Sequence, residues 1–125
     1  MRITHENRVR ALLFGLSEDL SGELLHPLSK FCSRIEEEKH PFSALADCSA
    51  QVIFCGPDTA VVTRLRAANP DASIVVVSRH PEVSGWLDSI EAGATDYCAA
   101  PFETAQVQWI LESSMRATSQ VPVSA

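Results

Sequence analysis

In Gly93-Ala94-Thr95-Asp96-Tyr97-Cys98-Ala99-Ala100-Pro101-Phe102, a glycine suited to ending a helix precedes a short segment, Asp96 to Ala99, that Pro101 limits on its other side. The segment before it carries apolar residues at i, i+3, i+4 and i+7, the spacing of an amphipathic helix: Val83, Trp86, Leu87 and Ile90. The segment after it, Glu103 to Met115, places Val107, Ile110 and Leu111 on one inward helical face. The sequence therefore predicts a strand, Asp96 to Ala99, between two helices.

Three further apolar runs lie upstream, at Val9–Phe14, Gln51–Cys55 and Ser73–Val77. Their hydrophobicity is continuous rather than alternating, which is typical of strands covered on both faces of a parallel sheet. Thr59 to Ala68 has helical spacing and ends at Asn69-Pro70, so it completes a βαβ unit with the strands around it.

The first third of the chain carries weaker signals. Ser17 is a suitable N-cap for a helix that Pro27 stops or kinks near Leu25, with an extension to Lys30 as the alternative. Ser33 to Glu38 has the acidic composition of a solvated edge strand, and Pro41 to Asp47 is predicted as a short helix.

Strands and helices in this alternation predict a three-layer α/β sandwich in which the carboxyl ends of the strands meet at one edge, where a site belongs. A chain of 125 residues supports one domain. We place this domain at residues 1–117 and predict a flexible tail or the start of a linker at 118–125.

Composition excludes several classes of function. The excess of acidic over basic residues gives a net charge of −6, which disfavours direct binding to nucleic acid. The N-terminus has no apolar stretch for export or membrane insertion, and the four cysteines form no CxxC pair. We expect a soluble, cytoplasmic protein with reduced cysteines and no metal site or cofactor.

The part of the chain from Asn69 to Phe102 resembles the receiver (CheY-like) domain of two-component response regulators. The resemblance rests on a strand ending in Ser78, a helix ending at Ala92-Gly93-Ala94, then Asp96-Tyr97 and Ala100-Pro101-Phe102, and it extends over Val9 to Arg116. It implies a flavodoxin-like fold with five parallel strands in the order 2-1-3-4-5. It also implies phosphorelay signalling and a cis bond before Pro101.

The resemblance further implies which positions would carry phosphotransfer, and this chain departs at nearly all of them. Gly15 and Leu16 stand where the metal-binding acidic pair belongs, Gly56 (or Cys55 on a one-residue shift) where the phosphoacceptor belongs, and Ala100 where the lysine belongs. Ser78 keeps the switch hydroxyl, although Ser78-Arg79-His80-Pro81 equally resembles an ordinary entry to a helix, and Tyr97 keeps the switch aromatic. We therefore predict a non-enzymatic pseudo-receiver.

Two alternatives compete with this prediction. Asp58 is a candidate surrogate phosphoacceptor, with Glu18 and Asp19 as surrogate metal ligands, although all three residue types also suit the starts of helices. A small-ligand site at the strand ends is the weaker alternative, because no Gly-rich loop follows a strand. Cys55 is a candidate redox-sensing thiol, against its interpretation as a core cysteine.

A pseudo-receiver would act through protein contacts. The resemblance points to the surface formed by the helix ending at Gly93, the strand Asp96 to Ala99 and the last helix, with a partner protein, an attached output domain or a second copy as the occupant. Trp109 falls nearly opposite Val107, Ile110 and Leu111, so we predict that it faces outward as an interface anchor.

Overall fold

The structure, a computed structural model, describes residues 9–38, 50–79 and 83–119. Its elements are β1 (Val9–Phe14), α1 (Glu18–Leu28), β2 (Cys32–Glu38), β3 (Val52–Cys55), α2 (Thr59–Ala68), β4 (Ser73–Ser78), α3 (Val83–Ala92), β5 (Asp96–Ala99) and α4 (Thr104–Ser119). All five strands lie within one residue of their predicted bounds. The helix predicted at Pro41 to Asp47 lies outside the described residues.

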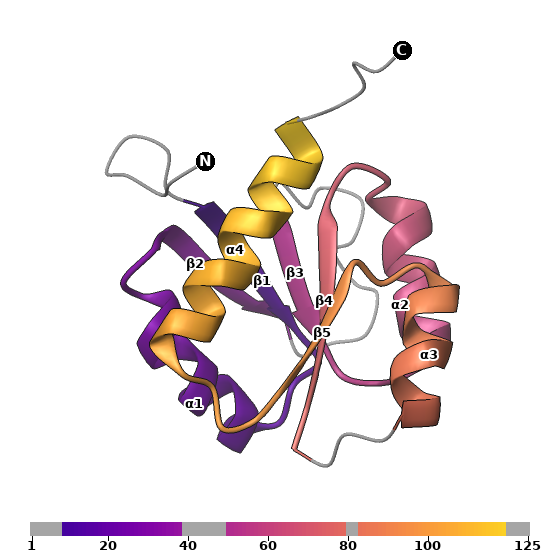
Figure 1. Cartoon of the computed structure of the whole chain (residues 1–125), viewed down its shortest axis with the longest axis horizontal. Helices are drawn as coiled ribbons and strands as arrows, with labels where there is room; N and C mark the ends of the chain where they lie inside the picture. Colours follow the sequence, from indigo (N-terminus) through magenta and orange to yellow (C-terminus); the bar gives the residue numbers. More distant parts are fainter. Residues whose placement is uncertain (1–8, 39–49, 80–82, 120–125) are drawn as a thin grey trace.

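The five strands form one sheet in the order β2-β1-β3-β4-β5, and every neighbouring pair is parallel. Helices α1 and α4 cover one face, and α2 and α3 cover the other (Figure 1). The predicted three-layer, flavodoxin-like architecture is therefore confirmed, with β2 as one edge strand and β5 as the other.

Two hydrophobic clusters lie on the two faces of the sheet. Alternate residues of the central strands enter different clusters: Phe54 packs with Leu24 of α1 and Leu111 of α4, whereas Ile53 packs with Leu65 of α2. Because both faces are covered, consecutive residues of β3 and β4 are all buried. This explains the continuous apolar runs in the sequence.

Two helices extend beyond their predicted ends. Helix α1 does not stop near Leu25 but continues through Pro27 to Leu28, so the predicted stop is wrong. The alternative, an extension to Lys30, has the right direction, and the helix ends two residues before Lys30. Pro27 lies one residue before Leu28, the last residue of the helix, and both side chains are buried. The free energy gained by this burial offsets the loss of the backbone hydrogen bond that proline cannot donate. Helix α4 runs through Ser119, which makes the first two residues of the predicted tail helical.

Helix α3 has its predicted span, but its large apolar residues do not pack inward. Trp86, Leu87 and Ile90 are 45%, 49% and 38% exposed, whereas Ser89 is fully buried. Small residues make the packed face, which allows α3 to lie close to α2 and β5. An amphipathic surface helix normally turns its apolar stripe toward the core, and α3 departs from this rule.

Arg66, near the end of α2, joins the loops that follow α2 and α3. Its guanidinium donates to the carbonyl oxygen of Gly93 through Nε and Nη2, at 3.1 and 3.0 Å. It also donates to the carbonyl oxygens of Asn69, Pro70 and Ala72, the last at 2.7 Å. Gly93 has φ 123°, a backbone conformation that favours glycine. A Cβ at this position would also lie only 3.1 Å from the Arg66 side chain, so close packing favours glycine as well.

Candidate functional site at the carboxyl edge of the sheet

The carboxyl ends of the strands converge at one edge, as parallel pairing requires. The register pairs Phe14 with Cys55, so the residues that follow them, Gly15 and Gly56, occupy equivalent positions at the ends of neighbouring strands. Ser78 ends β4, and Ala100 follows β5. The structure therefore brings together the positions predicted from the sequence, and of these four residues only Ser78 carries a polar side chain.

The two glycines differ in what their backbone requires. Gly15 has φ 65°, in the left-handed region that favours glycine. Gly56 lies outside that region, and a Cβ built on it would meet nothing within 4 Å. The backbone therefore leaves room for a side chain at Gly56. The lack of a carboxylate there is a difference in chemistry from a phosphoacceptor site and is not imposed by packing.

Leu16 and Cys55 belong to the core. Leu16 packs in the cluster under α1 and α4, and Cys55 packs, fully buried, in the cluster under α2. Burial, with a smaller contribution from the charge of Asp58, raises the pKa of the Cys55 thiol to about 12. A thiol with this pKa stays protonated at neutral pH, so the position favours a structural cysteine over a redox sensor.

Ser78 and Tyr97 are both held in the sheet. Ser78 is buried, and its carbonyl oxygen accepts a 2.9 Å hydrogen bond from the backbone N–H of Ala100. Tyr97 is half-buried against the cluster beneath α2 and α3. The Ala100–Pro101 bond is cis, as the resemblance implied.

Asp58, the candidate surrogate phosphoacceptor, is the N-cap residue of α2. Its Oδ1 accepts hydrogen bonds from the backbone N–H groups of Ala60 and Val61, at 3.0 and 3.3 Å. Glu18 and Asp19 lie in the first turn of α1, where negative charge is favourable. Among the residues that the structure describes, no three His, Cys, Asp or Glu side chains gather as metal ligands.

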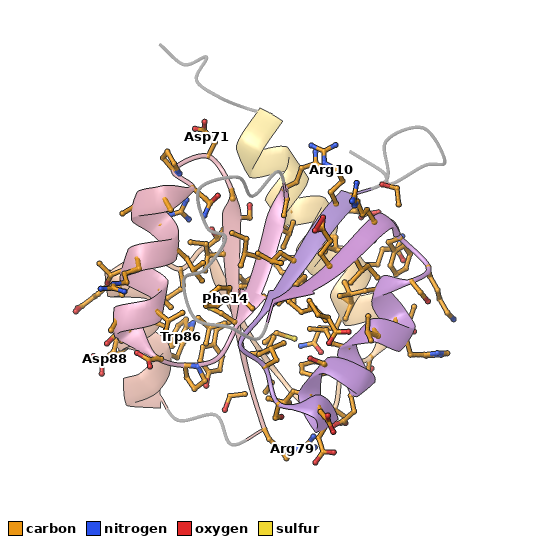
Figure 2. All side chains as sticks on the ribbon, turned by 180° about the vertical axis from the view of Figure 1, so that it is seen from behind. Arg10, Phe14, Asp71, Arg79, Trp86 and Asp88 are labelled. Carbon is orange, nitrogen blue, oxygen red and sulfur yellow. The ribbon has the colours of Figure 1, made fainter. Side chains whose placement is uncertain are left out.

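Sequence reasoning missed the cation at this edge. Arg79 follows Ser78 and forms an ion pair with Glu23 of α1, and this hydrogen bond to Glu23 is the main cause that raises the pKa of Arg79. Figure 2 shows Arg79 at the carboxyl edge of the sheet. The pair links the chain after β4 to α1, and its members are 56 positions apart, so no local spacing pattern could have indicated it.

Trp109 is 60% exposed on α4, whereas Val107, Ile110 and Leu111 are buried. The predicted orientation of this helix is therefore confirmed. None of the helices in the described ranges is long and apolar enough to cross a membrane.

No protein-family model matches the sequence, and no curated protein matches it either. Solved structures do match the fold. NtrX from Brucella abortus, in complex with ATP, superimposes with a TM-score of 0.79 at 19% identity over 90% of this chain, and this chain spans 27% of the NtrX length.

Two shorter chains are matched over almost their whole length. A response regulator from Thermotoga maritima superimposes with a TM-score of 0.75 at 18% identity, covering 86% of this chain and 98% of its own. The beryllofluoride-activated NtrC4 receiver domain dimer has the same TM-score at 16% identity, with coverage of 87% and 98%. The chain therefore has the flavodoxin-like fold of response-regulator receiver domains.

Proposed function

We propose that this chain is a receiver domain of two-component signalling that has lost phosphoacceptor chemistry and acts, in the cytoplasm, as a protein-interaction module without enzymatic activity. The observation that supports this most strongly is the carboxyl edge itself. Gly15, Gly56 and Ala100 lie together there, at positions where the receiver fold would place a metal ligand, the phosphoacceptor and a lysine.

The energetic consequence is large. Phosphoryl transfer to a carboxylate needs the nucleophile itself and cationic groups that offset the charge of the transferring group. Each missing preorganised contact removes about 3 kcal/mol of transition-state stabilisation. Arg79, a cationic residue at this edge, forms an ion pair with Glu23, and position 56 is a glycine with no carboxylate to accept the phosphoryl group.

We expect beryllofluoride with Mg²⁺ to leave the conformation unchanged. This phosphoryl mimic binds a phosphoacceptor carboxylate together with the metal, and Gly56, Gly15 and Leu16, which stand at the corresponding positions, carry no carboxylate. Amide NMR spectra before and after addition provide the measurement, with a phosphorylatable receiver as the positive control. Shifts at the amides of Gly15, Gly56 and Ala100 in the presence of the mimic would refute the proposal.

We place the interaction surface on α3, β5 and α4, with a partner protein, an attached output domain or a second copy as its occupant. Trp109 supports this placement, because a large aromatic residue on an outward face often dominates the energy of an interface.

Trp109→Ala is therefore expected to change the melting temperature little and to weaken association by roughly 2 kcal/mol where the residue is central to the contact. Calorimetry and analytical ultracentrifugation measure the two effects. Leu111→Ala is the matched control on the buried face of the same helix and should lower the melting temperature markedly. A similarly large loss of stability in Trp109→Ala would contradict the proposed role.

A further inference from the structure

Helix α3 carries an apolar stripe that the rest of the described structure leaves uncovered. Trp86, Leu87 and Ile90 are all more than a third exposed, and their spacing places them on one side of the helix. The exposure of three large neighbouring apolar side chains to water is unfavourable in free energy, and such patches mark interaction sites.

The stripe has an asymmetric border. With about 100° between successive residues, the order around the helix is the packed face at Ser89, then Trp86, Ile90, Leu87, Glu91 and Asp88. One border is therefore the protein body, and the other is a strip of two carboxylates. Figure 2 shows Trp86 and Asp88 on opposite sides of α3.

The acidic strip is not neutralised within the described structure. Helix α3 contains no lysine or arginine. Ion pairs in the described part of the chain join Arg34 to Glu36 and Arg79 to Glu23, and neither Asp88 nor Glu91 belongs to these two pairs. The guanidinium of Arg66 donates hydrogen bonds to backbone carbonyl oxygens in the loops after α2 and α3, such as those of Ala72 and Gly93.

This charge arrangement discriminates between occupants. In a two-fold dimer the same surface meets itself, and packing stripe on stripe with the two α3 helices antiparallel would bring the Asp88 and Glu91 strips of two copies toward each other. With the helices parallel, each acidic strip would lie over the other copy's border at Ser89 and would gain no ion pair from its α3, which contains no lysine or arginine. Like charges held together at an interface are unfavourable, and the net charge of −6 per chain opposes self-association further. A partner with basic residues at the border would instead gain ion pairs there.

We propose that α3 binds an amphipathic helix of another protein, whose apolar face covers Trp86, Leu87 and Ile90 and whose lysines or arginines meet Asp88 and Glu91. The inference rests on the proposed function as an interaction module and specifies the chemistry of its partner. Helix-on-helix burial supplies the affinity, and the charged border sets partner choice and orientation.

Two synthetic amphipathic helices with the same leucine face test the proposal, one bordered by lysine and the other by glutamate. We expect the lysine peptide to bind about tenfold more tightly, as two new exposed ion pairs predict, and to weaken as salt is raised. Fluorescence anisotropy of labelled peptides measures both affinities. Leu87→Ala should weaken binding of the lysine peptide with an unchanged melting temperature, since this side chain is exposed.

The double variant Asp88→Lys/Glu91→Lys should reverse the preference between the peptides. Glu37→Lys, on the exposed edge strand β2, makes the same kind of charge change far from α3 and should leave the preference intact. Equal binding of the two peptides, or a preference that survives the double variant, overturns the proposal. So does a dimer in sedimentation equilibrium that Leu87→Ala abolishes.

These outcomes are separate from those that test the loss of phosphoacceptor chemistry. If the lysine peptide does not bind preferentially, the proposal of a basic partner is rejected, and the beryllofluoride result is unaffected. Binding of beryllofluoride at the carboxyl edge would remove the proposed function whatever the peptides do.

Discussion

Arg66→Ala is expected to lower the free energy of unfolding by about 3 kcal/mol, because leaving a buried polar group without its partner costs roughly 1–3 kcal/mol. The guanidinium satisfies the carbonyl oxygens of Gly93 and Ala72 in a half-buried position. It also bonds Oγ1 of Thr95, which in turn accepts from the backbone N–H of Ile74 in β4. Truncation therefore loosens the connection between β4 and β5 as well as the end of α2.

The loss should appear as a fall in melting temperature of roughly 10 °C for a domain of this size. Arg66→Lys should recover little of it, because a single ammonium cannot reproduce the planar set of donors that reaches both loops. Burial lowers the pKa of Arg66, and the nearby charge of Asp71 opposes this shift, yet the guanidinium stays charged at working pH.

Arg34→Ala is the matched control for Arg66→Ala. Arg34 pairs with Glu36 on the edge strand, and both side chains are more than half exposed, so its removal should cost less than about 0.5 kcal/mol. Chemical denaturation of the three variants measures the differences. Arg66→Ala and Arg34→Ala with equal stability would contradict this account of how the two loops are held.

The strands of this fold were predictable from the sequence because burial on both faces leaves a local mark. Val9–Phe14 and Ser73–Ser78 are apolar along their length, which only a covered parallel sheet explains. Asp58 was predictable as a cap because its partners are two and three residues away. The order of the strands came from the family resemblance.

The features that the sequence did not reveal depend on distant partners or on a conflict with the usual pattern. Arg66 and Gly93 are 27 positions apart, and Arg79 and Glu23 are 56 apart, so no local spacing connects them. Helix α3 obeys the amphipathic spacing and still turns Trp86, Leu87 and Ile90 outward. Its small residues occupy the packed face, and periodicity alone does not distinguish a stripe that covers the core from one that covers a partner.

We propose that this protein keeps the receiver fold and lacks its phosphoacceptor chemistry. The largest consequence is a complete lack of modification by a phosphoryl donor. The competing hypothesis assigns the phosphoryl group to Asp58, whose carboxylate holds the first turn of α2 through the N–H groups of Ala60 and Val61. Phosphorylation there would displace those bonds and would have to proceed without a described cluster of metal ligands.

Intact-mass spectrometry after incubation with acetyl phosphate and Mg²⁺ tests this claim most directly, with a phosphorylatable receiver in a parallel reaction and Asp58→Asn as the second sample. We expect the mass of the wild-type chain to stay unchanged while the control receiver gains one phosphoryl group. A phosphoryl group on the wild-type chain that disappears in Asp58→Asn would contradict it and would establish Asp58 as the acceptor.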